Sequence, residues 1–145
     1  TDFAAKDVNG IPISLSQFKG KKIVLLEFWA SWCVKCREGF PHLKELYEKY
    51  HPMGFEVVAI DGFDKDIASW VSAIKQDNIE RWYHVPTVFR NGQTINEQIA
   101  LDYPINPIPR SILIDKNGKV VGHWLGNNEQ NKEALEAELK ELFGR

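Results

Sequence analysis

The sequence is poor in cysteine and methionine and lacks long apolar runs, and these shortages exclude particular classes of protein. Its 145 residues contain two cysteines and one methionine. Disulfides cannot be the main support of the fold, and a chain of this length can build a core without them. No apolar run approaches the ~20 residues that a membrane-spanning helix needs. The chain also lacks internal repeats, low-complexity tracts and interdomain linkers, so we expect one domain over residues 1–145.

An excess of positive charge is missing too. The chain carries 18 Lys and Arg against 20 Asp and Glu, a net charge of −2. It therefore has no basic field to attract nucleic acid and no polybasic surface for anionic lipid, and we expect neither as a partner. Hydrophobic residues make up 43% and charged residues 26%, which is typical of a globular protein.

Both cysteines lie in the stretch that organises the chain, IVLLEFWASWCVKCREGFP over residues 23–41. Residues 23–29 form an apolar run of strand length that only Glu27 interrupts, which predicts a strand buried on both faces. From about Lys35 onward, apolar residues recur at helical spacing. Cys33 is therefore expected where a central strand gives way to a helix.

A thiol at such a junction is reactive. Unpaired N–H groups and the helix dipole favour an anion there, so Cys33 should ionise more readily than a free thiol of pKa ~8.5. Cys36, three residues on, lies on the same helical face and can form a disulfide with Cys33. Lys35 and Arg37 add positive charge beside the nucleophile and act in the same direction.

Two cysteines three residues apart can also bind zinc or form an inert structural disulfide. A closed zinc site needs four ligands, and the four histidines are scattered without paired spacing. An inert structural disulfide would close a very short loop and remove little chain entropy. Neither use explains the position of the pair as well as redox chemistry does.

The remaining segments predict an α/β order. Residues 3–22 form a hairpin around the turn dipeptide Asn9-Gly10, and residues 55–60 form a second strand parallel to the first. Asp64 is a candidate cap for a helix whose apolar stripe begins at Ile67. A β-hairpin over residues 111–125 and a surface helix ending at Gly144 complete the chain. Residues 81–103 carry an aromatic stretch and a weak helical pattern, which do not define an element.

Together these motifs resemble the thioredoxin superfamily. The resemblance is carried by FWASWCVKC after an apolar strand, by Pro41 five residues past the second cysteine, and by the Ile108-Pro109 pair before the strand ILID. It implies a thioredoxin fold, with a central mixed β-sheet flanked by helices. The N-terminal hairpin and an inserted helical segment are similar to the TlpA/ResA type of extracytoplasmic thiol–disulfide oxidoreductase.

The resemblance also implies roles for individual residues. Cys33 matches the nucleophilic cysteine and Cys36 the resolving cysteine. Pro109 matches the cis-proline opposite the pair, and together with Ile108 and Trp32 it is expected to contact the substrate. Between the cysteines the family's common proline is absent, and Gly39 replaces a frequent glutamate. These departures bear on redox potential and on the choice of partner.

Glu27 matches a buried carboxylate of thioredoxin. An unpaired buried carboxylate is costly, so such a group finds a partner, takes up a proton or serves function. One interpretation has Glu27 facing a polar cleft or pairing with a lysine. The other has burial raising its pKa, so that it can accept the proton of Cys36 near neutral pH.

We therefore expect a thiol–disulfide oxidoreductase that acts on protein or peptide disulfides and draws on an upstream electron donor or acceptor. It needs no cofactor beyond the Cys33–Cys36 disulfide, and no metal. The resemblance to the TlpA/ResA type leads us to expect a monomer outside the cytoplasm, in the bacterial periplasm and tethered to the membrane in a longer form. The chain begins at Thr1 without a methionine, which we interpret as a processed mature form or an excised domain. The alternatives are a non-enzymatic redox-sensing or metal-binding module and a peroxiredoxin-like peroxidase. The peroxidase would need a threonine where Ala30 stands.

Overall fold

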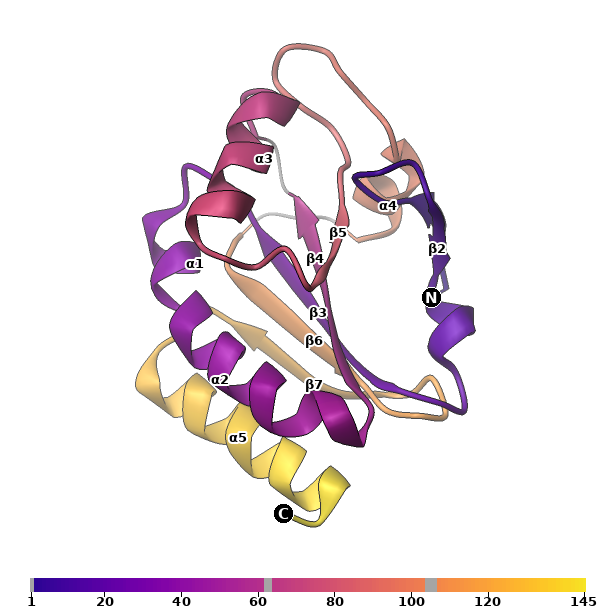
Figure 1. The fold of residues 1–145 in the computed structure, drawn as a ribbon, viewed down its shortest axis with the longest axis vertical. Helices are drawn as coiled ribbons and strands as arrows, with labels where there is room; N and C mark the ends of the chain where they lie inside the picture. Colours follow the sequence, from indigo (N-terminus) through magenta and orange to yellow (C-terminus); the bar gives the residue numbers. More distant parts are fainter. Residues whose placement is uncertain (1, 62–63, 104–106) are drawn as a thin grey trace.

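The apolar run over residues 23–29 forms the centre of the sheet. In the computed structural model, which describes residues 2–61, 64–103 and 107–145, every residue of this strand is buried. Five strands pair side by side, and the central strand runs parallel to three of the others and antiparallel to the fourth (Figure 1). In spatial order they are β5 (Tyr83–Val85), β4 (Phe55–Asp61), β3 (Ile23–Trp29), β6 (Arg110–Ile114) and β7 (Val120–Leu125). The expected mixed sheet is confirmed.

Two apolar layers cover the two faces of this sheet. Alternate residues of a strand point to opposite faces, so Leu25 and Trp29 join one layer while Leu26 and Phe28 join the other. The first layer contains residues from α1 (Val34–Glu38), α2 (Phe40–Tyr50), α3 (Ile67–Gln76) and α5 (Glu129–Phe143). The second contains residues from the N-terminal hairpin of β1 (Ala4–Lys6) and β2 (Pro12–Ser14), from the short helix η1 (Leu15–Phe18) and from α4 (Glu97–Asp102). The remaining 3₁₀ turn is η2 (His51–Met53).

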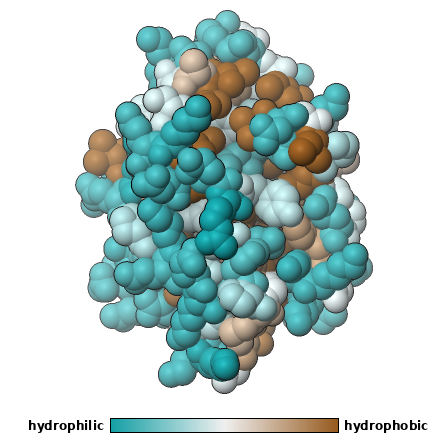
Figure 2. Space-filling view, in the orientation of Figure 1, coloured by the Kyte–Doolittle hydropathy of each residue, from teal (hydrophilic) through white to brown (hydrophobic). Residues whose placement is uncertain are grey.

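The outer surface differs between the two ends of the molecule. Figure 2 shows hydrophilic residues over most of the lower half, around α2 and α5, and apolar residues gathered near the top, beside α3 and the segment that leads to α4. Within the part of the chain that the structure describes, no helix is long and apolar enough to cross a membrane.

The helix after the cysteines is broken, whereas the sequence predicts one continuous helix from about Lys35. α1 ends at Glu38 and α2 begins at Phe40, with Pro41 in the first turn of α2. Proline lacks an N–H group, and its ring clashes with the carbonyl four residues earlier, here that of Arg37. The break therefore follows from Pro41 and separates the short cysteine helix from the longer α2.

The region around α3 corrects one prediction and places the segment that the sequence left open. Asp66, and not Asp64, caps α3, because its side chain accepts a hydrogen bond of 2.7 Å from the Ser69 N–H. Residues 83–85 form β5, parallel to β4, and residues 97–102 form α4. The N-terminal hairpin and the end of α5 at Gly144 are as predicted, and Gly144 adopts the left-handed conformation with φ 73°.

Candidate active site

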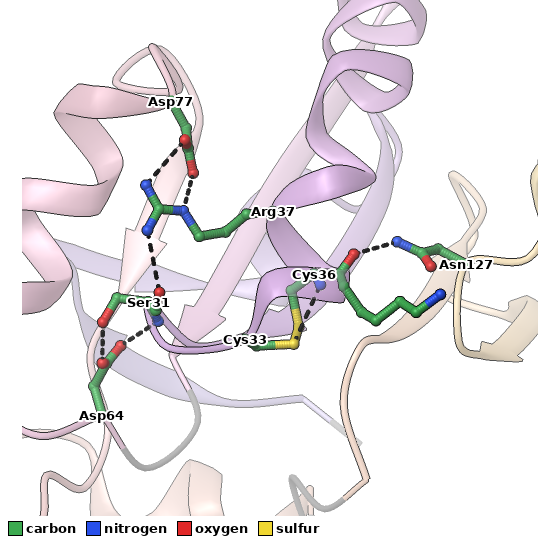
Figure 3. The surroundings of a disulfide bond; sticks show 8 residues. Ser31, Cys33, Cys36, Arg37, Asp64, Asp77 and Asn127 are labelled. Carbon is green, nitrogen blue, oxygen red and sulfur yellow. Dashed lines mark hydrogen bonds and ion pairs between the residues drawn. A yellow bond between two sulfur atoms is a disulfide. The ribbon is translucent and has the colours of Figure 1, made fainter.

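The two cysteines lie at the carboxyl end of β3, where α1 begins. Cys33 is the residue that caps α1, and the N–H of Cys36 donates a hydrogen bond of 3.2 Å to its Sγ atom. The two sulfur atoms form a disulfide with their Cα atoms 5.3 Å apart (Figure 3). Cys33 is 7% exposed and Cys36 only 1%. A backbone donor aimed at Sγ favours the thiolate, and Cys33 is the more accessible sulfur.

Two acidic residues and one arginine hold the loop before Cys33. The buried Asp64 accepts hydrogen bonds from the N–H of Ser31, at 2.8 Å, and from its hydroxyl. On the other side, Arg37 Nη1 donates to the carbonyl of Ser31 at 3.1 Å. Figure 3 shows the same guanidinium paired with Asp77, with Nε to Oδ2 at 2.7 Å and Nη2 to Oδ1 at 3.1 Å. Ser31 is thus fixed from both sides.

The pairing of Arg37 differs from the sequence prediction. The hydrogen bonds that Arg37 donates to Asp77 raise the pKa of Arg37, which stays charged, but the guanidinium faces Asp77 and not the sulfur atoms. The charge of Arg37 is therefore largely neutralised by Asp77. Its hydrogen bonds connect the loop before Cys33 to the end of α3.

The side chain of Asn127 supports the first turn of α1 and lies close to the backbone of Gly39. Asn127 Nδ2 donates to the carbonyl of Lys35 at 2.6 Å. A Cβ atom on residue 39 would lie 2.5 Å from this Nδ2 atom, so Gly39 leaves the space that Asn127 occupies. The glycine that departs from the family pattern thus has a steric explanation.

Glu27 is buried in β3, 3% exposed, and the Ser111 hydroxyl donates a hydrogen bond to its carboxyl. The two residues are opposite each other in the β3–β6 register. Burial raises the pKa of Glu27 to about 8, although the bond from Ser111 acts in the opposite direction. The carboxyl lines a cavity of about 30 Å³ together with His42, Asn127 and other residues, room for roughly one water molecule. No lysine forms an ion pair with Glu27 among the described residues.

The three residues expected to contact the substrate differ in how far they are exposed. The Ile108–Pro109 peptide bond is cis, as the resemblance implies, and Pro109 is buried. Ile108 is half-buried and packs against the apolar cluster that contains both cysteines. Trp32 is 51% exposed, and the guanidinium of Arg90 lies over its ring, 5.6 Å from the centroid.

Several residues of this site were not found from the sequence. Ser31, Asp64, Asp77, Asn127, Ser111 and Arg90 come from segments far apart in the chain. Of these residues only Ser111 has a sequence signal, and it is weak: the alternation of side chains along β6 assigns it to one face of the sheet. In residues 2–61, 64–103 and 107–145 no group of three or more His, Cys, Asp or Glu side chains could hold a metal ion.

Comparison with known proteins agrees with this geometry. A family model described as thioredoxin-like matches residues 20–120. Thiol-disulfide oxidoreductase ResA of Bacillus thuringiensis is 38% identical over 141 residues, 97% of this chain and 75% of that protein. The Bacillus subtilis protein of the same name is 34% identical over 83% of this chain and 62% of that protein. The crystal structure of a thiol:disulfide interchange protein, DsbE of Chlorobium tepidum, has a TM-score of 0.80 and 34% identity, and covers 99% of this chain and 94% of that one.

The chain therefore belongs to the thioredoxin-like family. Its strand order, the cysteine pair at the start of α1 and the cis bond before Pro109 agree with this class. Within it, the chain is an enzyme of the thiol–disulfide oxidoreductase type, with ResA and DsbE among its relatives.

Proposed function

We propose that Cys33 is the nucleophile and Cys36 the resolving thiol in exchange with disulfides of proteins or peptides. The Cys33 thiolate attacks one substrate sulfur, a mixed disulfide forms, and the other substrate sulfur leaves as a thiolate that takes up a proton. The Cys36 thiolate then attacks Cys33 Sγ, closes the Cys33–Cys36 disulfide and releases the second substrate thiol. Two electrons pass from the protein to the substrate, and the reverse sequence oxidises a dithiol.

One observation carries this assignment. The Cys36 N–H donates to Cys33 Sγ, and Cys33 is the more exposed of the two cysteine residues. A backbone donor lowers the free energy of the thiolate at Cys33, where an incoming disulfide can reach it. Cys36 is covered by the apolar cluster and becomes accessible only to a sulfur already joined to Cys33.

Glu27 is proposed as the group that accepts the Cys36 proton. It lies on the face of β3 that packs against the cysteine helix, since Leu25 and Trp29 on either side of it contribute to that cluster. A carboxyl with a pKa near 8 gains and loses a proton in the range where thiols ionise. The Ser111 hydroxyl orients the carboxyl and stabilises its charged form.

Trp32, Ile108 and Pro109 are proposed to bind the substrate around the scissile disulfide. Trp32 is half exposed beside Cys33, and the Ile108 side chain packs on the cysteine cluster from the opposite segment. An extended substrate segment could pair with backbone groups in this gap.

We further propose that residues 1–145 act as one domain and as a monomer. No metal and no cofactor besides the disulfide is required, and a separate thiol partner resets the redox state after each turnover. We place this activity outside the cytoplasm, in the bacterial periplasm and tethered to the membrane in a longer form, because the family type to which the hairpin and inserted helices belong works there.

Single-cysteine variants test the assignment. Cys33→Ser should abolish exchange, whereas Cys36→Ser should attack substrate and accumulate mixed disulfides, because nothing resolves them. In the reduced protein, iodoacetamide should alkylate Cys33 at least about tenfold faster than Cys36. Mass spectrometry of the trapped adducts gives the site, and equal alkylation of both thiols would overturn the division of labour. Hydrogen peroxide in place of the disulfide should give no comparable turnover.

A further inference from the structure

Three side chains form a row across one face of the sheet. Glu27 of β3 is opposite Ser111 of β6, and Ser111 is opposite Trp124 of β7. Residues paired directly across neighbouring strands point to the same face, so all three lie on the face that packs against the cysteine helix. β7 ends the order of strands that the structure describes. Trp124 is therefore the member of the row at the sheet edge.

The indole ring of Trp124 lies against Gly122, two residues earlier on the same face of β7. A Cβ atom on residue 122 would be 2.2 Å from Trp124 Cη2 and 2.7 Å from Cζ3, closer than two carbon atoms can approach. The backbone of Gly122 lies outside the left-handed region, so alanine would suit the chain itself. Glycine at this position thus provides the space that the indole ring occupies.

The same ring forms a wall of the cavity that contains the Glu27 carboxyl. This cavity of about 30 Å³ is lined by Glu27, Ser111 and Trp124, and by Leu43 of α2 and Leu135 of α5. Glu27 is 3% exposed, whereas Trp124 is half-buried and packs against the apolar cluster. A half-buried ring at the sheet edge, next to a buried carboxyl, lies between that carboxyl and bulk water.

The charged groups that share the cavity do not explain how Glu27 ionises. His42 of α2 and Lys132 of α5 also line it, and His42 Nε2 lies 2.5 Å from the Glu136 carboxyl. Within the described part of the chain, neither His42 nor Lys132 forms an ion pair with Glu27. Burial is the largest influence on the pKa of Glu27, and it raises that pKa. Exclusion of water, more than a neighbouring charge, therefore decides how this carboxyl titrates.

We propose that Trp124, held in place by Gly122, is a positioning residue that keeps bulk water away from Glu27. It acts through Glu27 and not on the sulfur atoms. Without the ring, water would solvate the Glu27 carboxylate and make it a weaker base for the Cys36 proton. This inference rests on the proposed function, because it concerns the proton acceptor of the same thiol pair.

Two substitutions should each let water reach Glu27: Gly122→Ala displaces the ring, and Trp124→Ala removes it. In the oxidised protein, where no thiol titrates, carbon-13 NMR of the glutamate carboxyl groups gives the pKa of Glu27, and the absence of its signal from Glu27→Gln identifies it. We expect this pKa to fall by at least about one pH unit in both variants. In stopped-flow kinetics, the midpoint of the pH profile for substrate release should move down by the same amount.

An exchange of sizes should restore the wall. A phenylalanine ring does not reach as far as the indole atoms that a methyl group on residue 122 would meet. Adding Trp124→Phe to Gly122→Ala should therefore return the pKa of Glu27 toward its wild-type value, although two wall residues have changed.

Val120→Ala is the matched control. Val120 lies in the same strand, is 52% exposed, and is opposite Ile114 of the second apolar layer. This variant should keep the wild-type pKa and midpoint. Urea unfolding shows whether each variant is folded. Should Gly122→Ala fail to fold, Trp124→Ala and Val120→Ala carry the comparison, since both only remove side-chain atoms from β7.

Failure of this inference and failure of the proposed function give different results. An unchanged pKa of Glu27 in the Gly122 and Trp124 variants, or an equal fall in Val120→Ala, would overturn the role of Trp124 whatever the kinetics. If the pKa of Glu27 falls as expected but the midpoint for substrate release stays in place, Trp124 still keeps water from Glu27, and the proposed role of Glu27 as proton acceptor fails.

Discussion

At the scale of single residues, Glu27 is a buried carboxyl on the sheet face that packs against the cysteine helix, and its charge changes with pH near neutrality. Glu27 has one described hydrogen-bond partner, Ser111, and a pKa near 8, so most of it is protonated at neutral pH. The fraction able to accept a proton grows as the pH rises toward 8. A neutral acid also costs less to bury than a charged one, which explains how β3 tolerates this residue.

Glu27→Gln should therefore slow the second step of exchange and spare the first. We expect release of reduced substrate from the Cys33 mixed disulfide to fall by about 100-fold, the usual contribution of a positioned base, while attack by Cys33 changes little. The wild-type rate of release should rise up to about pH 8 with an ionisation that the variant lacks. Stopped-flow kinetics of both steps from pH 5 to 9 gives the comparison. An unchanged pH profile for release would show that Glu27 is not the base.

At the scale of elements, α1 is a short helix held by contacts that come from outside it. Its first turn receives the amide of Asn127, and that amide fits because residue 39 has no side chain. The backbone of Gly39 is helical, with φ −82° and ψ −12°, so alanine would suit the chain itself. The conflict is purely with the Asn127 side chain.

The effect of Gly39→Ala on the free energy of unfolding should therefore depend on whether Asn127 is present. Gly39→Ala should destabilise the wild-type protein by about 1 kcal/mol, because Asn127 is displaced and its hydrogen bond is lost. In the Asn127→Ala background the same change should be neutral or stabilising, because alanine is the better helix residue. Urea unfolding of the four proteins measures the coupling. Additive effects would mean that the two residues do not compete for space.

Local pattern was enough for the elements whose signals lie within one segment. The run over residues 23–29, the stripe of α3 and the glycine after α5 each specify their own structure. β5 has only three residues and depends on its pairing with β4, so its own sequence could not define it. Asp64 and Asp66 both precede Ile67, and only the extended backbone of Asp66 decides which one caps α3. The other aspartate is taken up by Ser31, 33 positions earlier.

The site residues also divide into those that one segment of sequence identifies and those that depend on tertiary pairing. Cys33, Cys36 and Glu27 are read from one continuous stretch, and the cis bond before Pro109 follows from family resemblance. Ser111 is paired with Glu27 through the register between two strands, 84 positions apart in the chain, and the sequence of either strand alone does not contain that register.

At the scale of the whole molecule, two buried groups of opposite character set the response of stability to pH. Between pH 4.5 and about 8 the folded chain keeps the Glu27 proton that the unfolded chain has released, so stability falls as pH rises through this range. The pKa of His84 is lowered to about 4 by burial, so its contribution is complete above pH 6.5 and is lost as pH falls through that value toward 4. The two effects oppose each other between pH 4.5 and 6.5, and of these two groups only Glu27 contributes above pH 6.5.

The wild-type protein should therefore lose on the order of 2 kcal/mol of unfolding free energy between pH 6.5 and 8 through Glu27. Glu27→Gln should remove this loss and be the more stable protein at pH 8. Glu141→Gln, an exposed carboxyl on α5, should retain the wild-type slope. Urea unfolding at half-unit pH intervals tests both, and parallel curves for the wild type and Glu27→Gln would contradict a buried, protonated Glu27.

The donor that Cys33 receives from Cys36 is a main-chain N–H group, so no point mutation of a side chain can delete it. Selection can therefore exchange the two residues between the cysteines, here Val34 and Lys35, without losing the anion-stabilising contact. What varies freely there is the surface offered to partners. A lineage can change this dipeptide, and with it the charge that residue 35 adds beside the nucleophile, while the main-chain contribution to the acidity of Cys33 is inherited with the path of the chain.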